Sequence, residues 1–211
     1  MKDKSKKEII QRYQERIAQF GVTYDSLGSG KKSHQTIRFN IQKNIGIQSG
    51  DKILDIGCGL GDFYNFLKEK KIDVEYYGVD LVPELIAEAK IKNPECTFEM
   101  RDITEDPFPK NSFDFVVSSQ VMNLKFTDDD NDEHIKTMLE QMFSASIKGV
   151  ACDFLTNFVD FKESHLNYYD PSLVFNLAKS LTKRVDLIHS YPLFEFTIYL
   201  YPDFEGWSEN K

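Results

Sequence analysis

The chain has 211 residues, enough for one doubly wound core but too few for a second independent domain, so we expect a single domain over residues 1–211. Hydrophobic residues make up 41% and charged residues 28%, a composition that excludes an intrinsically disordered chain. The formal net charge of -8 argues against nucleic acid as the main partner, because proteins that bind phosphate backbones usually carry a basic surface.

The sequence shows no membrane-spanning segment, no secretory signal and no cysteine pattern typical of disulfides or metal sites. No apolar run approaches the roughly 20 residues that cross a bilayer, and the lysine-rich start lacks the apolar segment of a secretory signal. These absences predict a cytoplasmic protein without a membrane partner. The sequence leaves open whether the protein is a monomer or a homodimer. Cys58, Cys96 and Cys152 are far apart and have no metal-ligand spacing, so we expect buried thiols and neither disulfides nor a zinc site.

The charge is distributed unevenly along the chain. Residues 1–50 hold ten lysines and arginines against four acidic residues, while the remainder is strongly acidic. Two interpretations stay open. The basic residues can form a solvated helix face, or they can form a cationic lid over an anionic substrate.

The first fifty residues are expected to form a helical cap. A stripe of apolar residues at three- and four-residue spacings predicts a helix over Lys6–Phe20, which Gly21 ends. Ser33 is expected to cap a second helix that runs through Ile37 and Ile41.

From Lys52 onward, short apolar strands alternate with helical stretches, which is the pattern of βα units around a parallel sheet. The expected strands are Lys52–Ile56, Glu75–Asp80, Thr97–Arg101, Phe113–Ser118 and Val150–Leu155. Helices are expected at Asp62–Lys70, Pro83–Lys92, Asp129–Phe143 and Pro171–Leu181. Two last strands, Val185–Ser190 and Glu195–Tyr201, are joined by a link so short that it suits only an antiparallel pair. The order predicts an α/β fold with a mostly parallel, seven-stranded sheet and a C-terminal antiparallel hairpin.

The strongest local signal is a strand that runs straight into a glycine turn and a helix start, from Ile53 to Asp62. Its glycines, Gly57, Gly59 and Gly61, let a ligand approach the backbone at a helix N-terminus. A dinucleotide-binding turn would need glycine at position 62, where Asp62 stands, and Asp55 adds a second carboxylate. These charges disfavour a pyrophosphate and favour a cationic ligand such as a sulfonium with an α-amino group, which S-adenosylmethionine provides.

Two further aspartates stand at strand ends. Asp80 closes the second strand, where a carboxylate can accept both ribose hydroxyls. Asp102 follows the third strand, where it can accept from an adenine amino group while Leu81 and Ile103 enclose the ring. Ligands of open α/β sheets bind at these carboxyl ends, so the three aspartates together predict a site for S-adenosylmethionine.

Residues 52–126 resemble the cofactor-binding half of class I S-adenosylmethionine-dependent methyltransferases, on the motifs LDIGCGLG, YYGVDL, RDI and FDFVVSSQ. The resemblance implies a Rossmann-like fold with a cofactor-binding half over residues 51–145 and a substrate-side half over 146–211. It implies Asp55, Cys58 and the glycines near the methionine moiety, and Ser119 with Gln120 beside the amino acid and the methyl group. Asp80 would bind the ribose, and Asp102 with Ile103 the adenine.

The outer parts of the chain are similar to bacterial small-molecule methyltransferases of surface-polysaccharide or secondary-metabolite pathways. An Asn-Pro-Pro-Tyr-type tetrapeptide, which accompanies methylation of nucleic-acid bases and of protein glutamine, is absent after the fourth strand. We therefore expect an enzyme that methylates a small polar metabolite, such as a sugar or a precursor of those pathways. A cofactor-binding protein without turnover, or an RNA or protein methyltransferase, is the alternative.

The acceptor site is less well specified. His34 and His165 lie in segments expected above the cofactor and are the candidate general bases, although a structural or exposed histidine is the simpler interpretation of each. Arg38 can pair with the methionine carboxylate or with an anionic substrate, or it can be a surface arginine without such a role. The candidate substrate contacts are Tyr24, Asn123, Asn157 and Tyr168. His134 is expected at the surface.

No metal is expected. The acidic run over residues 128–133 precedes a helix, and carboxylates at a helix start are explained by the helix dipole.

Overall fold

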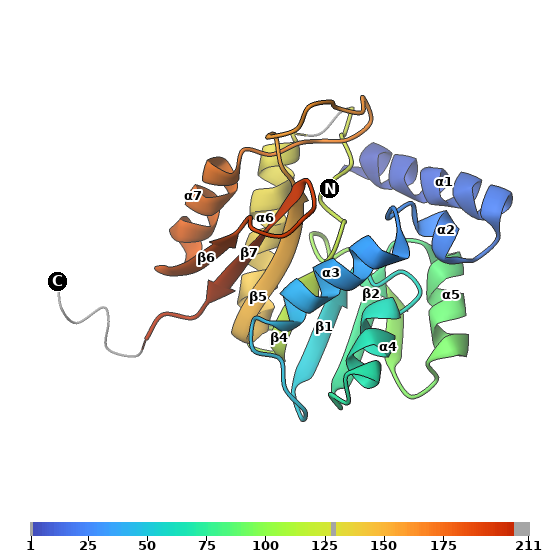
Figure 1. Cartoon of the computed structure of the whole chain (residues 1–211). Coiled ribbons are helices and arrows are strands. Elements are labelled where there is room, and N and C mark those ends of the chain that lie inside the picture. The colour runs from blue at the N-terminus through green and yellow to red at the C-terminus, as the bar shows by residue number, and fades with distance from the viewer. Residues whose placement is uncertain (1, 128–129, 205–211) are drawn as a thin grey trace.

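The computed structural model describes residues 2–127 and 130–204 as a seven-stranded sheet covered by helices on both faces (Figure 1). The strands are β1 (Lys52–Ile56), β2 (Glu75–Asp80), β3 (Thr97–Met100), β4 (Phe113–Ser118), β5 (Ser146–Leu155), β6 (Arg184–Ile188) and β7 (Glu195–Tyr201). The helices are α1 (Asp3–Phe20), α2 (Tyr24–Leu27), α3 (Lys32–Lys43), α4 (Asp62–Glu69), α5 (Pro83–Lys92), α6 (Asn131–Ala145) and α7 (Pro171–Leu181).

The sheet has the strand order β3-β2-β1-β4-β5-β7-β6. Neighbours from β3 to β5 pair in parallel, while β7 is antiparallel to both β5 and β6. The predicted fold class is thus confirmed, including the late hairpin. Because β1 lies between β2 and β4, the chain reverses its direction of travel across the sheet there, which opens a crevice at the carboxyl ends of these strands.

Two hydrophobic clusters fill the space between the sheet and the helices on its two faces. One contains the inward faces of α6 and α7, such as Leu139 and Val174, against one face of the sheet. The other contains α3 and α4 residues, such as Phe39 and Phe63, against the opposite face. Within the described part of the chain, no helix is both long enough and apolar enough to cross a membrane.

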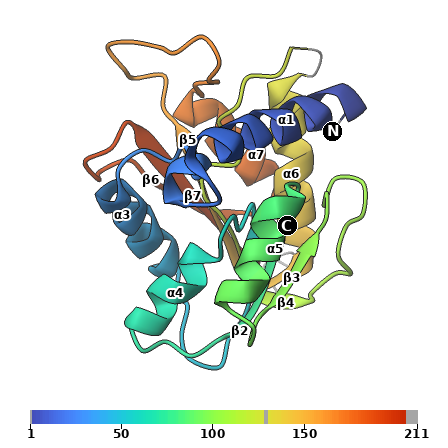
Figure 2. The same cartoon turned by 90° about the vertical axis from the view of Figure 1, so that its right-hand side faces the viewer.

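The first helix lies across the carboxyl edge of the sheet rather than on either face (Figures 1 and 2). Its residues Tyr13 and Ile17 pack on Leu60, Val82 and Leu85, which belong to the glycine loop and the start of α5. The apolar stripe predicted for this helix therefore covers the crevice.

Several local predictions are wrong. Ser33 does not cap α3, because the helix begins at Lys32, with Lys31 at the N-cap position and no side-chain cap. The short helix α2 was not expected. The fifth strand begins at Ser146 rather than Val150, because the polar start of the segment pairs with β4. Asp130 caps α6 by accepting from the Asp132 N–H, and the predicted start of that helix at Asp129 lies outside the described residues, as does Asp128.

Candidate functional site

The glycine loop after β1 is fixed to the neighbouring strand. The backbone N–H groups of Gly57 and Cys58 both donate to the carbonyl oxygen of Val79, at 2.7 and 3.0 Å. Gly57 has φ +72°, and an added Cβ would lie 2.1 Å from the Val121 Cγ2 atom. Only glycine satisfies both constraints, so the loop passes close under the segment that follows β4.

Asp80 organises the loop from the end of β2. Its Oδ2 atom accepts from the Gly59 N–H at 3.0 Å, and its Oδ1 atom accepts from the Val82 N–H, also at 3.0 Å. Each carboxylate oxygen has two lone pairs, so both oxygens retain the capacity to accept from a ligand hydroxyl.

The two carboxylate oxygens of Asp102 differ in their hydrogen bonding, since one accepts two hydrogen bonds and the other accepts none within the described part of the chain. Its Oδ1 atom accepts from the backbone N–H and the hydroxyl of Thr104, at 3.0 and 2.7 Å. Its Oδ2 atom is buried and, among the described residues, receives no hydrogen bond, although the Lys6 ammonium lies 3.5 Å away. Lys6 itself donates to Glu105 at 2.8 Å. An amino group in the crevice could therefore donate to the open oxygen.

Asp55, near the end of β1, is the most buried of these three aspartates, with 4% of its surface exposed. The hydroxyl of Tyr76 donates to its carboxylate. Burial raises the pKa of Asp55 to about 7, although the bond from Tyr76 opposes this shift. A cation placed near this carboxylate would restore its charged form.

A second group of buried charges lies beneath α3. Asp153 in β5 and Glu195 in β7 are 1% and 6% exposed, and the Arg38 guanidinium donates to Glu195 at 3.0 Å. Asp153 accepts from the hydroxyl of Ser119 and from the backbone N–H of Gln120, both at 2.7 Å. Neither carboxylate was identified in the sequence. The isolated charge of Asp153 within the apolar run 149–155 was the available signal for it.

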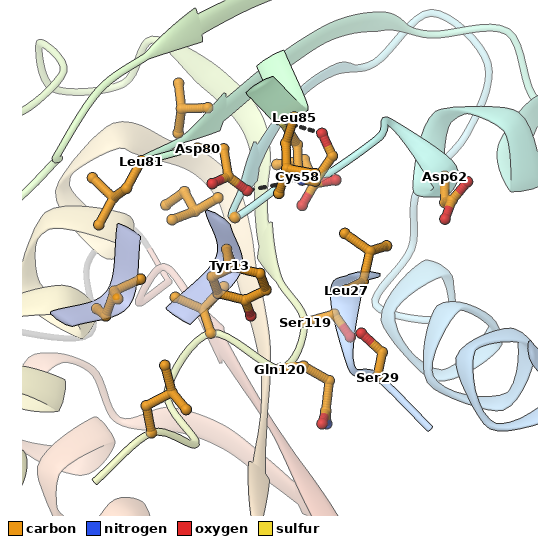
Figure 3. A pocket seen from close by; sticks show the side chains of 18 of the residues that line it. Tyr13, Leu27, Ser29, Cys58, Asp62, Asp80, Leu81, Leu85, Ser119 and Gln120 are labelled. Carbon is orange, nitrogen blue, oxygen red and sulfur yellow. Dashed lines mark hydrogen bonds between the residues drawn. The ribbon is translucent and has the colours of Figure 1, made fainter. Parts of the chain in front are cut away.

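Asp55, Asp80 and Asp102 line one pocket of about 1110 Å³, including its open part, at the carboxyl edge of the sheet (Figure 3). Of the residues predicted to bind the cofactor, all but Gly61 line it: Arg38, Asp55, Gly57, Cys58, Gly59, Asp62, Asp80, Leu81, Asp102, Ile103, Ser119 and Gln120. Gly61 instead occupies the N-cap position of α4. The polar groups that line it suit a nucleoside with a charged side chain.

The N-terminal helices supply lining residues that the sequence did not predict, among them Ile9 and Tyr13. Burial raises the pKa of Tyr13 to about 12, and the nearby Asp80 adds to the shift. Figure 3 shows Tyr13 between Asp80 and Gln120. His134 also lines the pocket and is 8% exposed, so the expectation that it lies at the surface is wrong.

The candidate bases and substrate contacts do not line this pocket: His34, His165, Tyr24, Asn123, Asn157 and Tyr168. The His165 side chain is 42% exposed and lies 3.5 Å from the Glu163 carboxylate. Asn123 is a buried structural residue whose side-chain oxygen accepts from the Leu155 N–H at 2.9 Å.

The other predicted substrate contacts form hydrogen bonds within loops or at the ends of short elements. The Tyr168 hydroxyl accepts from the Glu163 N–H at 3.1 Å, and the Tyr24 hydroxyl donates to the Gly30 carbonyl at 3.2 Å. The Asn157 N–H donates to the Tyr169 carbonyl at 2.9 Å. Over the described ranges, no cluster of potential metal ligands was found.

The sequence matches known methyltransferases. Residues 53–145 match the protein family described as Methyltransferase domain. Rv1506c of Mycobacterium tuberculosis, which carries a methyltransferase name, is 31% identical over 154 residues, covering 69% of this chain and 90% of that protein. Phosphoethanolamine N-methyltransferase 1 of Arabidopsis thaliana is 34% identical over 105 residues, and this match covers 47% of the chain but only 20% of the plant protein.

Solved structures share the fold at low sequence identity. Magnesium protoporphyrin IX methyltransferase from Synechocystis, with bound S-adenosylhomocysteine, has a TM-score of 0.65 at 14% identity, covering 94% of this chain and all of that one (100%). Phosphoethanolamine N-methyltransferase 1 from Haemonchus contortus has a TM-score of 0.69 at 13% identity, covering 97% of this chain and 51% of that one. With the match to Rv1506c, these findings show that the chain belongs to the class I S-adenosylmethionine-dependent methyltransferases and uses S-adenosylmethionine as its cofactor.

Proposed function

We propose that this chain transfers the methyl group of S-adenosylmethionine to a small polar metabolite held at the carboxyl edge of the sheet. One observation carries the proposal. Asp55, Asp80 and Asp102, which end or follow three adjacent strands, line a single pocket. Their order along the edge is that of a cationic end, a diol and an amino-bearing ring in one ligand.

Each part of the cofactor has a matching group in the pocket. Asp102 would accept from the adenine amino group through its open oxygen, with Ile103 and Leu81 against the ring. Asp80 would accept from the ribose hydroxyls through its remaining lone pairs. Asp55 and the glycine loop would hold the methionine end. The division into a helical cap, a cofactor half and a substrate half follows from this placement and is part of the proposal.

Bound S-adenosylmethionine supplies a methyl group on a positively charged sulfur, which an acceptor nucleophile displaces. The chain's contribution is alignment and exclusion of water. Tyr13 and Ile9 on α1 cover the pocket from the solvent side. Ser29, Gln35 and Arg38 line the same pocket near Asp62, and we place the entry of the acceptor there.

The cationic residues near the pocket do not favour an anionic acceptor. Arg38 is paired with Glu195 at 3.0 Å, and the Lys32 ammonium lies 3.9 Å from Asp62. These partners neutralise the charges that a cationic lid would need. The names of two similar structures give a protoporphyrin and phosphoethanolamine as the methyl acceptors of those proteins. For this chain, a sugar or a polysaccharide precursor, which the resemblance suggested, is one hypothesis within the class of small polar acceptors.

Calorimetric titration with S-adenosylmethionine and S-adenosylhomocysteine tests the cofactor placement. We expect micromolar binding of both ligands. A labelled-methyl assay against amines, hydroxyls and carbon acids then tests turnover. A folded protein that binds neither ligand would refute the proposal, and binding without transfer to any acceptor class would favour the rival hypothesis of a non-catalytic binding protein. Retention of the protein on RNA in a salt-dependent manner would favour a nucleic-acid substrate instead.

A further inference from the structure

Asp153 is a buried carboxylate that does not line the pocket but accepts hydrogen bonds from two residues that do. It lies in β5 between apolar neighbours, is 1% exposed, and accepts four hydrogen bonds. Two come from the Ser119 hydroxyl and the Gln120 N–H, at 2.7 Å each, and two from the side-chain amides of Gln120 and Gln42, at 3.2 and 3.3 Å. All four partners donate, so Asp153 determines which way their hydrogen atoms point.

This arrangement sets the polarity of the pocket wall. Because the Ser119 hydroxyl and the Gln120 side-chain amide both direct hydrogen atoms toward Asp153, their oxygen atoms are left as acceptors. Ser119 and Gln120 line the pocket and Asp153 lies behind them. A wall of this kind is complementary to a ligand group that donates hydrogen bonds.

The backbone is held in an uncommon conformation at the same point. Gln120 has φ +65°, in the left-handed region that residues with a side chain seldom adopt. The bond from its N–H to Asp153 stabilises this conformation. Strained backbone of this kind is concentrated at functional sites, where surrounding contacts maintain it.

We propose that Asp153 is a positioning residue that makes Ser119 and Gln120 a hydrogen-bond acceptor for the α-ammonium group of S-adenosylmethionine. The inference rests on the proposed function, which places the methionine end of the cofactor at the glycine loop. The segment after β4 lies directly against that loop, since a Cβ on Gly57 would lie 2.1 Å from Val121 Cγ2, and Ser119 and Gln120 line the same pocket as Gly57. Asp153 would act through its neighbours and would not touch the cofactor.

Asp153→Asn is the informative change because it preserves shape and reverses polarity. Asparagine has one acceptor oxygen and one donating amide, and each Asp153 oxygen accepts two hydrogen bonds, so two of the groups now donating to Asp153 must face another donor. The Ser119 hydroxyl, the group free to rotate, would then direct its hydrogen atom into the pocket, against the ammonium.

The test compares two ligands that differ in their amino-acid part. S-adenosylhomocysteine carries the α-ammonium, whereas 5′-methylthioadenosine lacks the amino acid altogether. We expect Asp153→Asn to weaken S-adenosylhomocysteine binding by roughly 10- to 100-fold, which is the range for loss of charge-assisted hydrogen bonds, and to change the affinity for 5′-methylthioadenosine by less than about threefold.

A matched control is Asp51→Asn. Asp51 is also buried, at 5% exposure, and accepts the Gln48 N–H at 2.7 Å, but it precedes β1 at the opposite edge of the sheet. We expect both ligands to bind this variant as they bind the wild type. If Asp153→Asn does not fold, Ser119→Ala, which removes the hydroxyl of a half-buried residue, should show the same selective loss at a smaller size.

Each outcome decides the question. A selective loss for S-adenosylhomocysteine supports the inference. An equal loss for both ligands in a folded Asp153→Asn protein would show a general structural role and overturn it, as would unchanged affinities. A wild-type protein that binds neither ligand would contradict the proposed function itself, and one that binds only 5′-methylthioadenosine would contradict the placement of the methionine end.

Discussion

Asp80→Asn would test whether one carboxylate both orders the glycine loop and binds the ribose. In the wild type, its two oxygens accept from the N–H groups of Gly59 and Val82, each at 3.0 Å. Asparagine can satisfy only one of them, because its amide nitrogen would face the other donor. Leaving one partly buried N–H without an acceptor costs about 1 to 3 kcal/mol of folding free energy.

The effect on the cofactor adds to this loss. A hydrogen bond from a ribose hydroxyl to a charged acceptor contributes about 1.5 to 3 kcal/mol, so the dissociation constant for S-adenosylhomocysteine should rise by roughly 10- to 100-fold. Calorimetry measures the affinity and urea denaturation the stability. Asp170→Asn is the control, because Asp170 caps α7 by accepting the Ser172 N–H at 2.8 Å and asparagine caps equally well. An Asp80→Asn protein that binds S-adenosylhomocysteine within threefold of the wild type would refute the assignment.

Three further changes test two residues that line the pocket and the buried ion pair beside it. Gly57→Ala should lose cofactor binding, since its Cβ would lie 2.1 Å from Val121 Cγ2, and Val121→Ala should restore part of that binding in calorimetry. Burial raises the pKa of Asp55 to about 7, so the folded state holds a proton that the unfolded state releases near pH 4. The melting temperature should therefore fall from pH 5 to pH 8, and fall less in Asp55→Asn. Glu195→Gln should lower the free energy of unfolding in urea by about 3 kcal/mol, because it leaves the buried Arg38 without its charged partner, whereas an unchanged midpoint would show that the pair adds nothing.

The cofactor side of the site could be predicted because its residues follow strand ends directly. Asp55, Asp80 and Asp102 each stand where an apolar strand stops, and a parallel sheet brings such positions to one edge. Ser119 and Gln120, which follow β4, were predicted from the resemblance to class I methyltransferases instead. The aspartates of this half of the pocket can therefore be predicted from local sequence alone.

The other half depends on pairing between distant segments. Glu195 reaches the edge because β7 runs antiparallel to β5, which places its first residue opposite Leu155. Arg38 meets Glu195 across 157 positions of sequence, a proximity that no local pattern contains. The histidines at positions 34 and 165 were chosen because their segments were expected above the cofactor. His34 lies in the first turn of α3 and His165 in the loop between β5 and α7, and neither side chain lines the pocket.

The buried carboxylates link the stability of the fold to its chemistry. Burial raises the pKa of both Asp55 and Glu195 to about 7 and also raises that of Asp153, so the empty site carries unfavourable negative charge above neutral pH. A ligand with a sulfonium and an ammonium group relieves that cost on binding. Methyl transfer converts the sulfonium to a neutral thioether, which removes one positive charge from the pocket. On the proposed placement of the methionine end, the Asp55 carboxylate should therefore favour S-adenosylmethionine over S-adenosylhomocysteine and help to release the product.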